Sequence, residues 1–328
     1  MLAYIGRRIV LAIFTVWAVS VLAFAIIQLP PGDYITSYIA QMASTGSIVS
    51  EQEAENLRIQ YGLNRPMYVQ YYKWMAQIAQ GSFGMSMEWR RPVLEVIGDR
   101  LWLTMVVSLA ALLLTWVLAL PIGIYSAVRQ YSLGDYAFTF LGFIGLAVPN
   151  FLLALVLLYL GFTLFGANIG GLFSVEYQDA SWSLAKLWDL LKHLPLPALI
   201  LGLAGTAQQI RIMRANLLDE LRKPYVVTAR AKGLTESKVI LKYPVRVALN
   251  PFVSTLGYAF PYLVSGSIIV SVVLSLPTVG PLLLKALIAQ DMFLAGTIVL
   301  MLGVMTVIGT LVSDILLVLI DPRIQLEN

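Results

Sequence analysis

The residues best suited to specific chemistry lie in one strongly basic stretch, residues 211–246. Nine of the 22 lysines and arginines of the chain fall within it. A run of small and cationic side chains occupies its centre, and no nucleophile stands there beside a base. Small side chains let another protein approach a backbone closely, and cations add electrostatic complementarity. The pattern is compatible with a contact with another protein, presented by residues 225–234.

These residues need a short helix to present them. Pro224 can begin it, because the missing N–H of proline has no cost at the first helical position. Gly233 can end it, because glycine adopts the left-handed conformation without a steric penalty. A second short helix is expected to begin at Thr235 or Glu236 and to run to about Tyr243. The sequence therefore predicts a compact helical knob between two longer elements.

A simpler interpretation of this stretch is that its cations anchor the chain to anionic lipid. That interpretation explains the charge, but it does not explain a helix rich in alanine and stopped by glycine. On the residues alone, lipid anchoring and partner docking both remain open.

Most catalytic chemistry is excluded by composition. The chain has no cysteine and one histidine, His193, which rules out thiolate chemistry and a histidine-rich metal site. No glycine is followed directly by lysine, so there is no P-loop lysine to hold a nucleotide. We therefore expect no enzymatic activity, no metal and no cofactor in this chain.

The composition is that of a polytopic membrane protein. Apolar residues make up 59% of the chain, charged residues 12%, and the mean hydropathy is +0.80. These values exclude disorder, a collagen-like chain and nucleic-acid binding as main interpretations. Apolar runs long enough to cross about 30 Å of hydrocarbon predict six transmembrane helices. They run from 9 to 29, 101 to 128, 136 to 165, 194 to 210, 247 to 276 and 292 to 320.

The first run is too long for a usual signal-peptide core, so we expect it to be a retained span rather than a cleaved leader. The positive-inside rule then fixes the orientation. With the N-terminus inside, cytoplasmic parts carry thirteen lysines and arginines, and the two short outer loops carry three. Both termini are therefore expected in the cytoplasm.

Segment 30–100 is expected outside, as a small helical cap. Ser50 and Glu53 have the spacing of a capping box, and residues 68–78 place apolar side chains at helical intervals. Gly81 and Gly84 should end that helix. The segment could be a lid on the spans, a docking surface for a soluble partner or a vestibule for a substrate.

Within the spans, few polar side chains could contact a substrate. Asn150, Gln208 and Gln209 are candidates for a path, although they could equally hold helices together. Asp314 could serve transport or only accept structural hydrogen bonds. Prolines at 149, 195, 197, 251, 261 and 277 predict kinks.

The basic stretch resembles the EAA loop of binding-protein-dependent ABC importer permeases. Its closest likeness is to the dipeptide, oligopeptide and nickel branch, in which the acid of the wider motif is missing, as it is here at Val227. Other short motifs follow in the order typical of that branch: Tyr4-Ile-Gly-Arg-Arg8, Pro31-Gly-Asp33, Tyr61-Gly-Leu-Asn-Arg-Pro66, Val69-Gln-Tyr71, Gly81-Ser-Phe-Gly84, Arg91-Pro-Val93, Val148-Pro-Asn-Phe151, Tyr225 to Leu234, Pro251, Leu276-Pro-Thr-Val-Gly280 and Asp321-Pro-Arg-Ile324.

The resemblance implies an all-α type I permease fold in a prokaryotic inner membrane. It divides the chain into a tail and first span (1–29), an outer segment (30–100) and a permease core (101–328) that contains the coupling loop 211–246. It also implies partners: a second permease subunit, typically a paralogue in a heterodimer, two ATPases that bind ATP and Mg²⁺, and an outer substrate-binding protein. The resemblance assigns the ATPase contact to Tyr225, Thr228, Ala229, Arg230, Ala231, Lys232, Gly233 and Leu234. The expected cargo is a di- or oligopeptide. Nickel complexes, oligosaccharides or a stand-alone secondary transporter are the alternatives.

Overall fold

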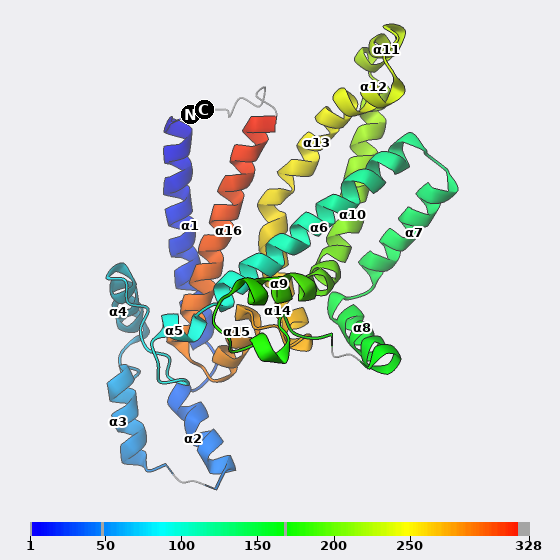
Figure 1. The fold of residues 1–328 in the computed structure, drawn as a ribbon. Helices are drawn as coiled ribbons and strands as arrows, with labels where there is room; N and C mark the ends of the chain where they lie inside the picture. Colours follow the sequence, from blue (N-terminus) through cyan, green and yellow to red (C-terminus); the bar gives the residue numbers. More distant parts are fainter. Residues whose placement is uncertain (1, 47–48, 167–168, 321–328) are drawn as a thin grey trace. The chain divides into compact units, whose positions relative to one another are not determined.

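A computed structural model describes residues 2–46, 49–166 and 169–320 of the chain. Helices dominate these residues, and Met85 and Pro92 form an isolated antiparallel bridge. Figure 1 shows the order of the elements. They are α1 (Leu2–Gln28), α2 (Tyr34–Ser44), α3 (Glu51–Tyr61), α4 (Met67–Ala79), α5 (Val93–Ile97), α6 (Arg100–Val128), α7 (Leu133–Ala147), α8 (Asn150–Phe165), η1 (Val175–Tyr177), α9 (Leu184–His193), α10 (Pro195–Leu221), α11 (Pro224–Ala231), α12 (Glu236–Lys242), α13 (Pro244–Ser254), α14 (Leu256–Val273), α15 (Val279–Ile288) and α16 (Met292–Ile320).

The chain forms two compact units. The first contains residues 1–102 and 278–307, and the second contains residues 103–277 and 308–328. Helices α1 to α5, α15 and the first part of α16 therefore belong to the first unit. Helices α6 to α14 make up most of the second.

The first unit packs around an aromatic cluster. Trp74 of α4 is 1% exposed, and Phe24 of α1 stacks on it with ring centroids 6.1 Å apart. Gly296 of α16 lies against the same indole, because a Cβ built there would be 3.1 Å from the ring. Ser20 and Tyr71 share a hydrogen bond of 2.7 Å beside this cluster. These contacts join α1, α4 and α16 of the unit.

The second unit is organised around α10, which packs against α7, α8, α13 and α14. Small residues let α6 and α10 approach closely. A Cβ at Gly202 would lie 3.0 Å from the carbonyl oxygen of Ala111, and one at Gly123 would lie 2.7 Å from the Cβ of Met213. Thr115 of α6 donates a hydrogen bond of 3.2 Å to the Gly202 carbonyl. Close approach through small residues is the usual way in which apolar helices associate in a membrane.

Five of the expected spans correspond to apolar helices or bent helix pairs. Among the described residues, the ranges Val10–Gln28, Arg100–Val128 and Met292–Val312 are each long and apolar enough to cross a membrane. Two further candidates are bent pairs, α7 with α8 and α9 with α10. The remaining expected span, 247–276, folds as α13 and α14 on either side of Thr255.

The span expected over residues 136–165 is broken into two helices, α7 and α8. The chain breaks after Ala147 and turns by 101° into α8. Pro149 precedes the first residue of α8, with a ψ of 135° that no α-helix allows. The expected proline kink is confirmed there, whereas Pro251 lies inside α13 without ending it. Pro195 occupies the first turn of α10, where proline is well tolerated.

Segment 30–100 contains the four helices α2 to α5, so its expected helical character is confirmed. The Ser50 hydroxyl accepts a hydrogen bond of 3.2 Å from the Glu53 amide, which confirms the first half of the expected capping box of α3. Helix α4 covers the expected range, and Gly81 follows it with a φ of +80°. Arg58 of α3 and Asp33 before α2 form an ion pair of 2.9 Å that ties these two helices together.

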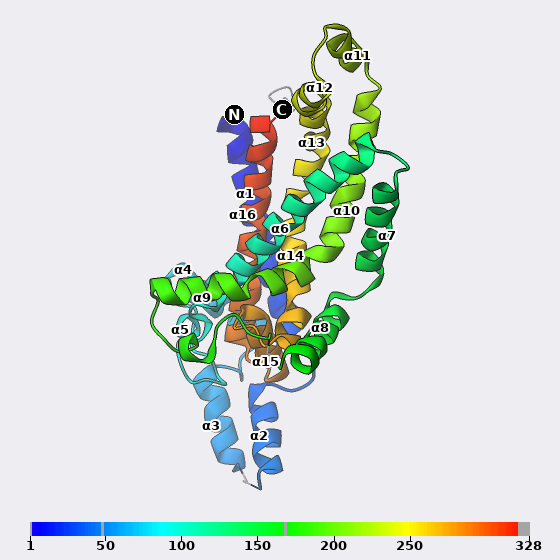
Figure 2. The ribbon, with the colours of Figure 1, turned by 45° about the vertical axis from the view of Figure 1, so that its right-hand side comes forward.

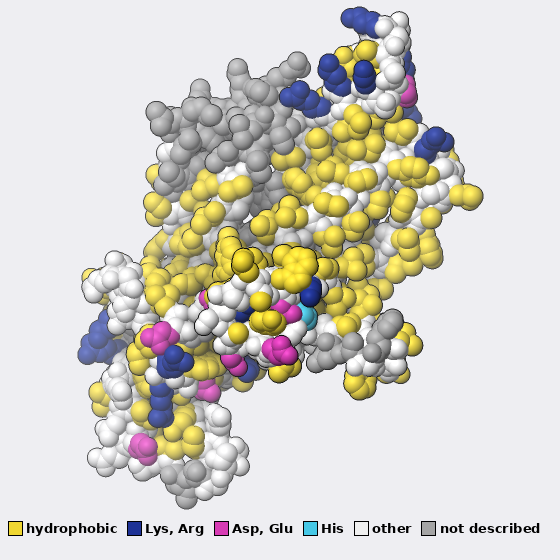
Figure 3. Space-filling view, viewed as in Figure 1, with side chains coloured by type: hydrophobic (Ala, Val, Ile, Leu, Met, Phe, Trp, Pro, Cys, Tyr) yellow, Lys and Arg dark blue, Asp and Glu magenta, His cyan; other side chains and the backbone are white. Residues whose placement is uncertain are grey.

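Apolar side chains cover the long helices of the second unit, and cations gather at one end. Figure 3 shows an almost continuous apolar surface over α6, α7 and α13, with lysines and arginines over α11 and α12. Both ribbon views place α11 and α12 at one end of α10 and α9 at the other (Figures 1 and 2). A surface of this kind is stable against lipid rather than water.

Candidate functional site

The knob predicted from the sequence forms, and it is a helical hairpin with its own small core. Helix α11 begins at Pro224 and ends at Ala231, and Gly233 follows with a φ of +76°. Helix α12 begins after Thr235. Val226 and Ala229 of α11 are buried against Val239 of α12. The hairpin is therefore held in shape by its own contacts.

Two polar contacts brace the same hairpin. The guanidinium of Arg230 donates to the carboxylate of Glu236 through Nη2 at 2.6 Å and through Nε at 3.1 Å. This cation holds the pKa of Glu236 below its usual value. The Tyr225 hydroxyl donates to Glu220 at the end of α10, at 2.5 Å. Burial, together with this carboxylate, raises the pKa of Tyr225, so its phenol stays a donor at neutral pH.

The outward face of α11 differs in part from the expectation. Ala229 was expected to let a partner approach, but it is 4% exposed and packs inside the hairpin. Arg230 was expected to supply free charge, but Glu236 neutralises it. Glu236 and Val239 were not recognised as partners, because their contacts depend on how the turn at Gly233 folds back. The remaining expected residues, Tyr225, Thr228, Ala231, Lys232, Gly233 and Leu234, are exposed, and so is Val227 at 58%.

Substitution of Gly233 by alanine tests the turn of the hairpin. No atom lies within 4 Å of the position that a Cβ would take there, so the effect comes from the backbone alone. A side chain in the left-handed region costs about 1 kcal/mol. We expect amide exchange in α11 to become roughly fivefold faster, measured by hydrogen–deuterium exchange.

Gly62 provides the matched control for this substitution. It has a φ of +71°, ends α3, and also has no atom within 4 Å of its Cβ position. Gly62→Ala should speed exchange in α3 and leave α11 unchanged. Unaltered exchange of α11 in Gly233→Ala would show that the turn does not hold the hairpin.

The expected path residues do not form one cluster. Gln209 is 5% exposed, and its amide nitrogen donates to the hydroxyl of Thr255 at the junction of α13 and α14. Gln208, its neighbour on α10, is exposed. Asn150 is half-buried at the start of α8, and no hydrogen bond of the described residues joins it to either glutamine. The side chain of Asp314 lies outside the described residues.

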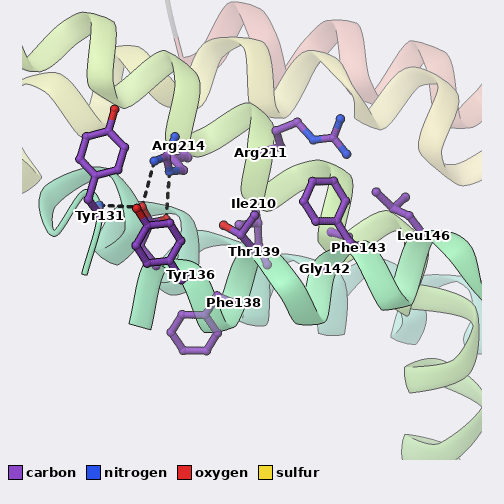
Figure 4. Close-up of a pocket in the computed structure, with 12 residues that line it drawn as sticks. Tyr131, Tyr136, Phe138, Thr139, Gly142, Phe143, Leu146, Ile210, Arg211 and Arg214 are labelled. Carbon is purple, nitrogen blue, oxygen red and sulfur yellow. Dashed lines mark hydrogen bonds and ion pairs between the residues drawn. The ribbon is translucent and has the colours of Figure 1, made fainter. Parts of the chain in front are cut away.

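A pocket of about 290 Å³ lies between α7 and α10 (Figure 4). At one end, Arg214 of α10 holds Asp135 of α7 through two hydrogen bonds, from Nε at 3.0 Å and from Nη2 at 2.9 Å. The amide of Tyr131 donates to the same carboxylate at 3.0 Å. Sequence reasoning missed this pair, because its members are 79 residues apart.

His193 lies at the end of α9 in a structural network. Its Nδ1 lies 2.8 Å from the carbonyl oxygen of Asp189, one turn earlier. The Asp189 carboxylate accepts from the amide and the hydroxyl of Ser174, both at 2.7 Å. Since the serine hydroxyl is bonded to the aspartate and not to the histidine, these residues lack the order of a catalytic triad. The network fixes the loop that precedes α9.

The geometry is therefore that of a polytopic membrane protein with a rigid cationic hairpin at one end of its helices. The family described as "Binding-protein-dependent transport system inner membrane component" matches residues 119–326. Its N-terminal counterpart, described as "Binding-prot-dependent transport system membrane comp, N-term", matches residues 1–110. The chain belongs to this family of ABC importer permeases, whose members lie in the bacterial inner membrane, so the resemblance seen in the motifs is confirmed.

Curated relatives extend over nearly the whole chain. The oligopeptide transport system permease protein AppB of Bacillus subtilis is 36% identical over 327 residues, covering 99% of this chain and 100% of the relative. The dipeptide transport system permease protein DppB of Lactococcus lactis is 31% identical, with coverage of 99% and 100%. The glutathione transport system permease protein GsiC of Escherichia coli is 31% identical, with coverage of 99% of each chain.

Proposed function

We propose that this chain is the membrane-spanning subunit of an ATP-driven importer of di- and oligopeptides, and that α11 couples it to the ATPases. The observation that carries the proposal is the α11–α12 hairpin. It is braced by its own core and by the Arg230–Glu236 pair, yet it presents an exposed face. A rigid projection of this kind can transmit force, because it does not deform when a partner moves against it.

In this proposal the chain crosses the membrane six times, with both termini and the α11–α12 hairpin in the cytoplasm. The nine cations of residues 211–246 support this orientation through the positive-inside rule. Helices α2 to α5 then lie outside, where a substrate-binding protein delivers its cargo.

The proposed importer contains two permease subunits, the second a paralogue of this chain, and two ATPases that bind ATP and Mg²⁺. The exposed face of α11 rests in a groove of one ATPase. When ATP closes the ATPase pair, α11 moves with it and rocks the spans from inward-open to outward-open. Val227 and Leu234 supply the apolar part of this contact, at 58% and 37% exposure.

Peptides are the favoured cargo because the names of three relatives refer to oligopeptide, dipeptide and glutathione transport. No comparable observation favours nickel complexes or oligosaccharides. Within the proposed path, Gln208 is a better candidate for substrate contact than Gln209, whose amide is already used by Thr255.

A pair of surface variants tests the coupling role. Val227 of α11 and Leu241 of α12 are exposed to nearly the same extent, 58% and 60%, on the two helices of the hairpin. In Val227→Glu, a carboxylate should enter the apolar contact. We expect co-purification of the ATPase to fall at least tenfold and ATP-dependent peptide uptake to be lost, since burying an unpaired charge costs several kcal/mol. Leu241→Glu should retain both.

Co-purification of the second permease subunit reports that each variant is folded. The coupling role is refuted if Val227→Glu retains the ATPase and transports peptide as the unmodified chain does. It is equally refuted if Leu241→Glu loses the ATPase to the same extent, because the contact would then not be specific to α11.

A further inference from the structure

Two arginines of α10 reach the pocket between α7 and α10, and only one of them has an acidic partner. Asp135 neutralises Arg214 with a two-point contact. Arg211, one turn earlier, is exposed, and no carboxylate among the described residues pairs with it. Figure 4 shows Arg211 extending toward Phe143, away from Arg214. The pocket therefore carries one uncompensated positive charge.

The rest of the pocket is apolar and open along α7. Phe143 and Leu146 line it and remain 59% and 42% exposed. There is open space beside Gly142, because a Cβ built there would make only an ordinary contact of 3.5 Å with the Cβ of Ala207. The pocket thus combines a cationic group with an apolar channel that leads away from it.

We propose that this pocket binds one anionic phospholipid, with its phosphate on Arg211 and an acyl chain along Phe143 and Leu146. Guanidinium groups bind phosphate with paired, charge-assisted hydrogen bonds. Basic pockets between transmembrane helices on the cytoplasmic side are a recognised kind of headgroup site. In the proposed orientation, the end of α10 that bears the α11–α12 hairpin faces the cytoplasmic leaflet, and Arg211 directly follows the expected span 194–210 on that side.

A peptide carboxylate is a poorer occupant of this pocket. A bound peptide would also bring several amide groups, each of which needs a hydrogen-bond partner once it leaves water. The Asp135 carboxylate and Arg214 already satisfy one another, and Thr139 is one of the few remaining polar side chains along the channel. A phospholipid needs a polar contact at one end only.

The test uses the full-length chain with its co-purifying subunits, delipidated in a neutral detergent and titrated with palmitoyl-oleoyl phosphatidylglycerol. Native mass spectrometry measures the bound fraction, and phosphatidylcholine with the same acyl chains is the comparison lipid. We expect phosphatidylglycerol to bind about tenfold more tightly than phosphatidylcholine, and Arg211→Gln to remove that preference.

Two variants make the test specific. Arg222→Gln removes an exposed cation that follows α10 outside the pocket, and it should leave the preference intact. Gly142→Leu keeps both arginines but fills the apolar channel, so it should weaken the binding of both lipids. The unfolding temperature of each variant shows that the chain remains folded.

Three results would each overturn the proposal. The first is an unchanged preference for phosphatidylglycerol in Arg211→Gln. The second is displacement of the lipid by inorganic phosphate at the same concentration, which would indicate a general anion site. The third is retention of an acidic tripeptide, and not of phosphatidylglycerol, by the unmodified chain, which would make the pocket a peptide subsite. None of these results depends on the chain being coupled to an ATPase.

Discussion

Gly202→Val is expected to lower the stability of the second unit by about 3 kcal/mol, at the upper end of the usual cost of overpacking. The Cβ would lie 3.0 Å from the Ala111 carbonyl oxygen and 2.8 Å from the Thr115 hydroxyl. The backbone oxygen cannot move aside, so α6 and α10 must separate. The hydrogen bond from Thr115 to the Gly202 carbonyl should then weaken as well. The purified protein should unfold roughly 6–12 °C lower in a thermal melt.

Gly205 is the control for this prediction, because it faces the same threonine one turn later. A Cβ at Gly205 would lie 3.7 Å from Thr115, an ordinary contact. Gly205→Ala should therefore keep the melting temperature or raise it, since alanine favours a helix over glycine by about 1 kcal/mol. Equal melting temperatures for Gly202→Val and Gly205→Ala would show that α6 and α10 are not in close contact.

The parts of the fold that the sequence predicts well are those set by local rules. Helix α11 begins at Pro224 and stops before Gly233, because the ring of proline and the freedom of glycine act within one turn. The cap at Ser50 is equally local. These features depend on neighbouring residues, so a single sequence contains the information needed to place them.

The parts that the sequence does not reveal depend on tertiary contacts. Pro149 predicts a kink in the apolar run from 136 to 165, but it does not predict that the chain turns there by 101°. A uniformly apolar pattern has no period that distinguishes a straight helix from two helices joined at an angle. The same limit applies to Thr255, where Gln209 of α10 holds the junction between α13 and α14.

For the candidate site, residue types were more predictable than residue roles. The exposed positions of α11 follow from the basic, alanine-rich pattern. The burial of Ala229 and the pairing of Arg230 do not, because both need α12 to fold back. The Asp135–Arg214 pair was also invisible in the sequence, since nothing local links residues on two different helices.

The second large effect is expected at Asp291, which precedes α16 in the first unit and is 0% exposed. Its carboxylate accepts from the Ser86 hydroxyl at 2.5 Å, the Glu88 amide at 3.1 Å and the Leu294 amide at 3.1 Å. Asp291→Ala would leave these donors without their acceptor. An unsatisfied buried donor costs about 1–3 kcal/mol, so the loss should reach roughly 3–5 kcal/mol.

Loop 82–92 gives a local readout of that loss. Ser86 and Glu88 bind Asp291 from this loop, and trypsin can cleave after the exposed Arg90 in it, but not after Arg91, which precedes Pro92. Cleavage there should be more than tenfold faster in Asp291→Ala, measured by limited proteolysis of the intact protein. Arg58→Gln, which breaks an ion pair elsewhere in the unit, should leave the rate of cleavage in this loop unchanged.

The pH dependence of the same loop separates the charge of Asp291 from its hydrogen bonds. Burial raises the pKa of the Asp291 carboxyl, and its hydrogen-bond donors offset this only in part. A pKa that is higher in the folded state means that the neutral form is favoured there. The neutral Asp291 carboxyl therefore contributes its full share to the stability of the folded state below the ordinary aspartate pKa, near 4. That contribution declines as the pH rises through the raised pKa of Asp291.

Trypsin is inactive in acid, so the protection of loop 82–92 is measured by pepsin cleavage at about pH 4. Hydrogen exchange from about pH 4 to 7 then measures it over the range in which Asp291 ionises. Loop 82–92 of the unmodified chain should lose protection as the pH rises, after correction for the intrinsic exchange rate. Asp291→Asn retains an acceptor oxygen and carries no charge, so its protection should stay level over the same range. A parallel decline in both proteins would mean that another group controls the loop, because the neutral amide has no proton to lose.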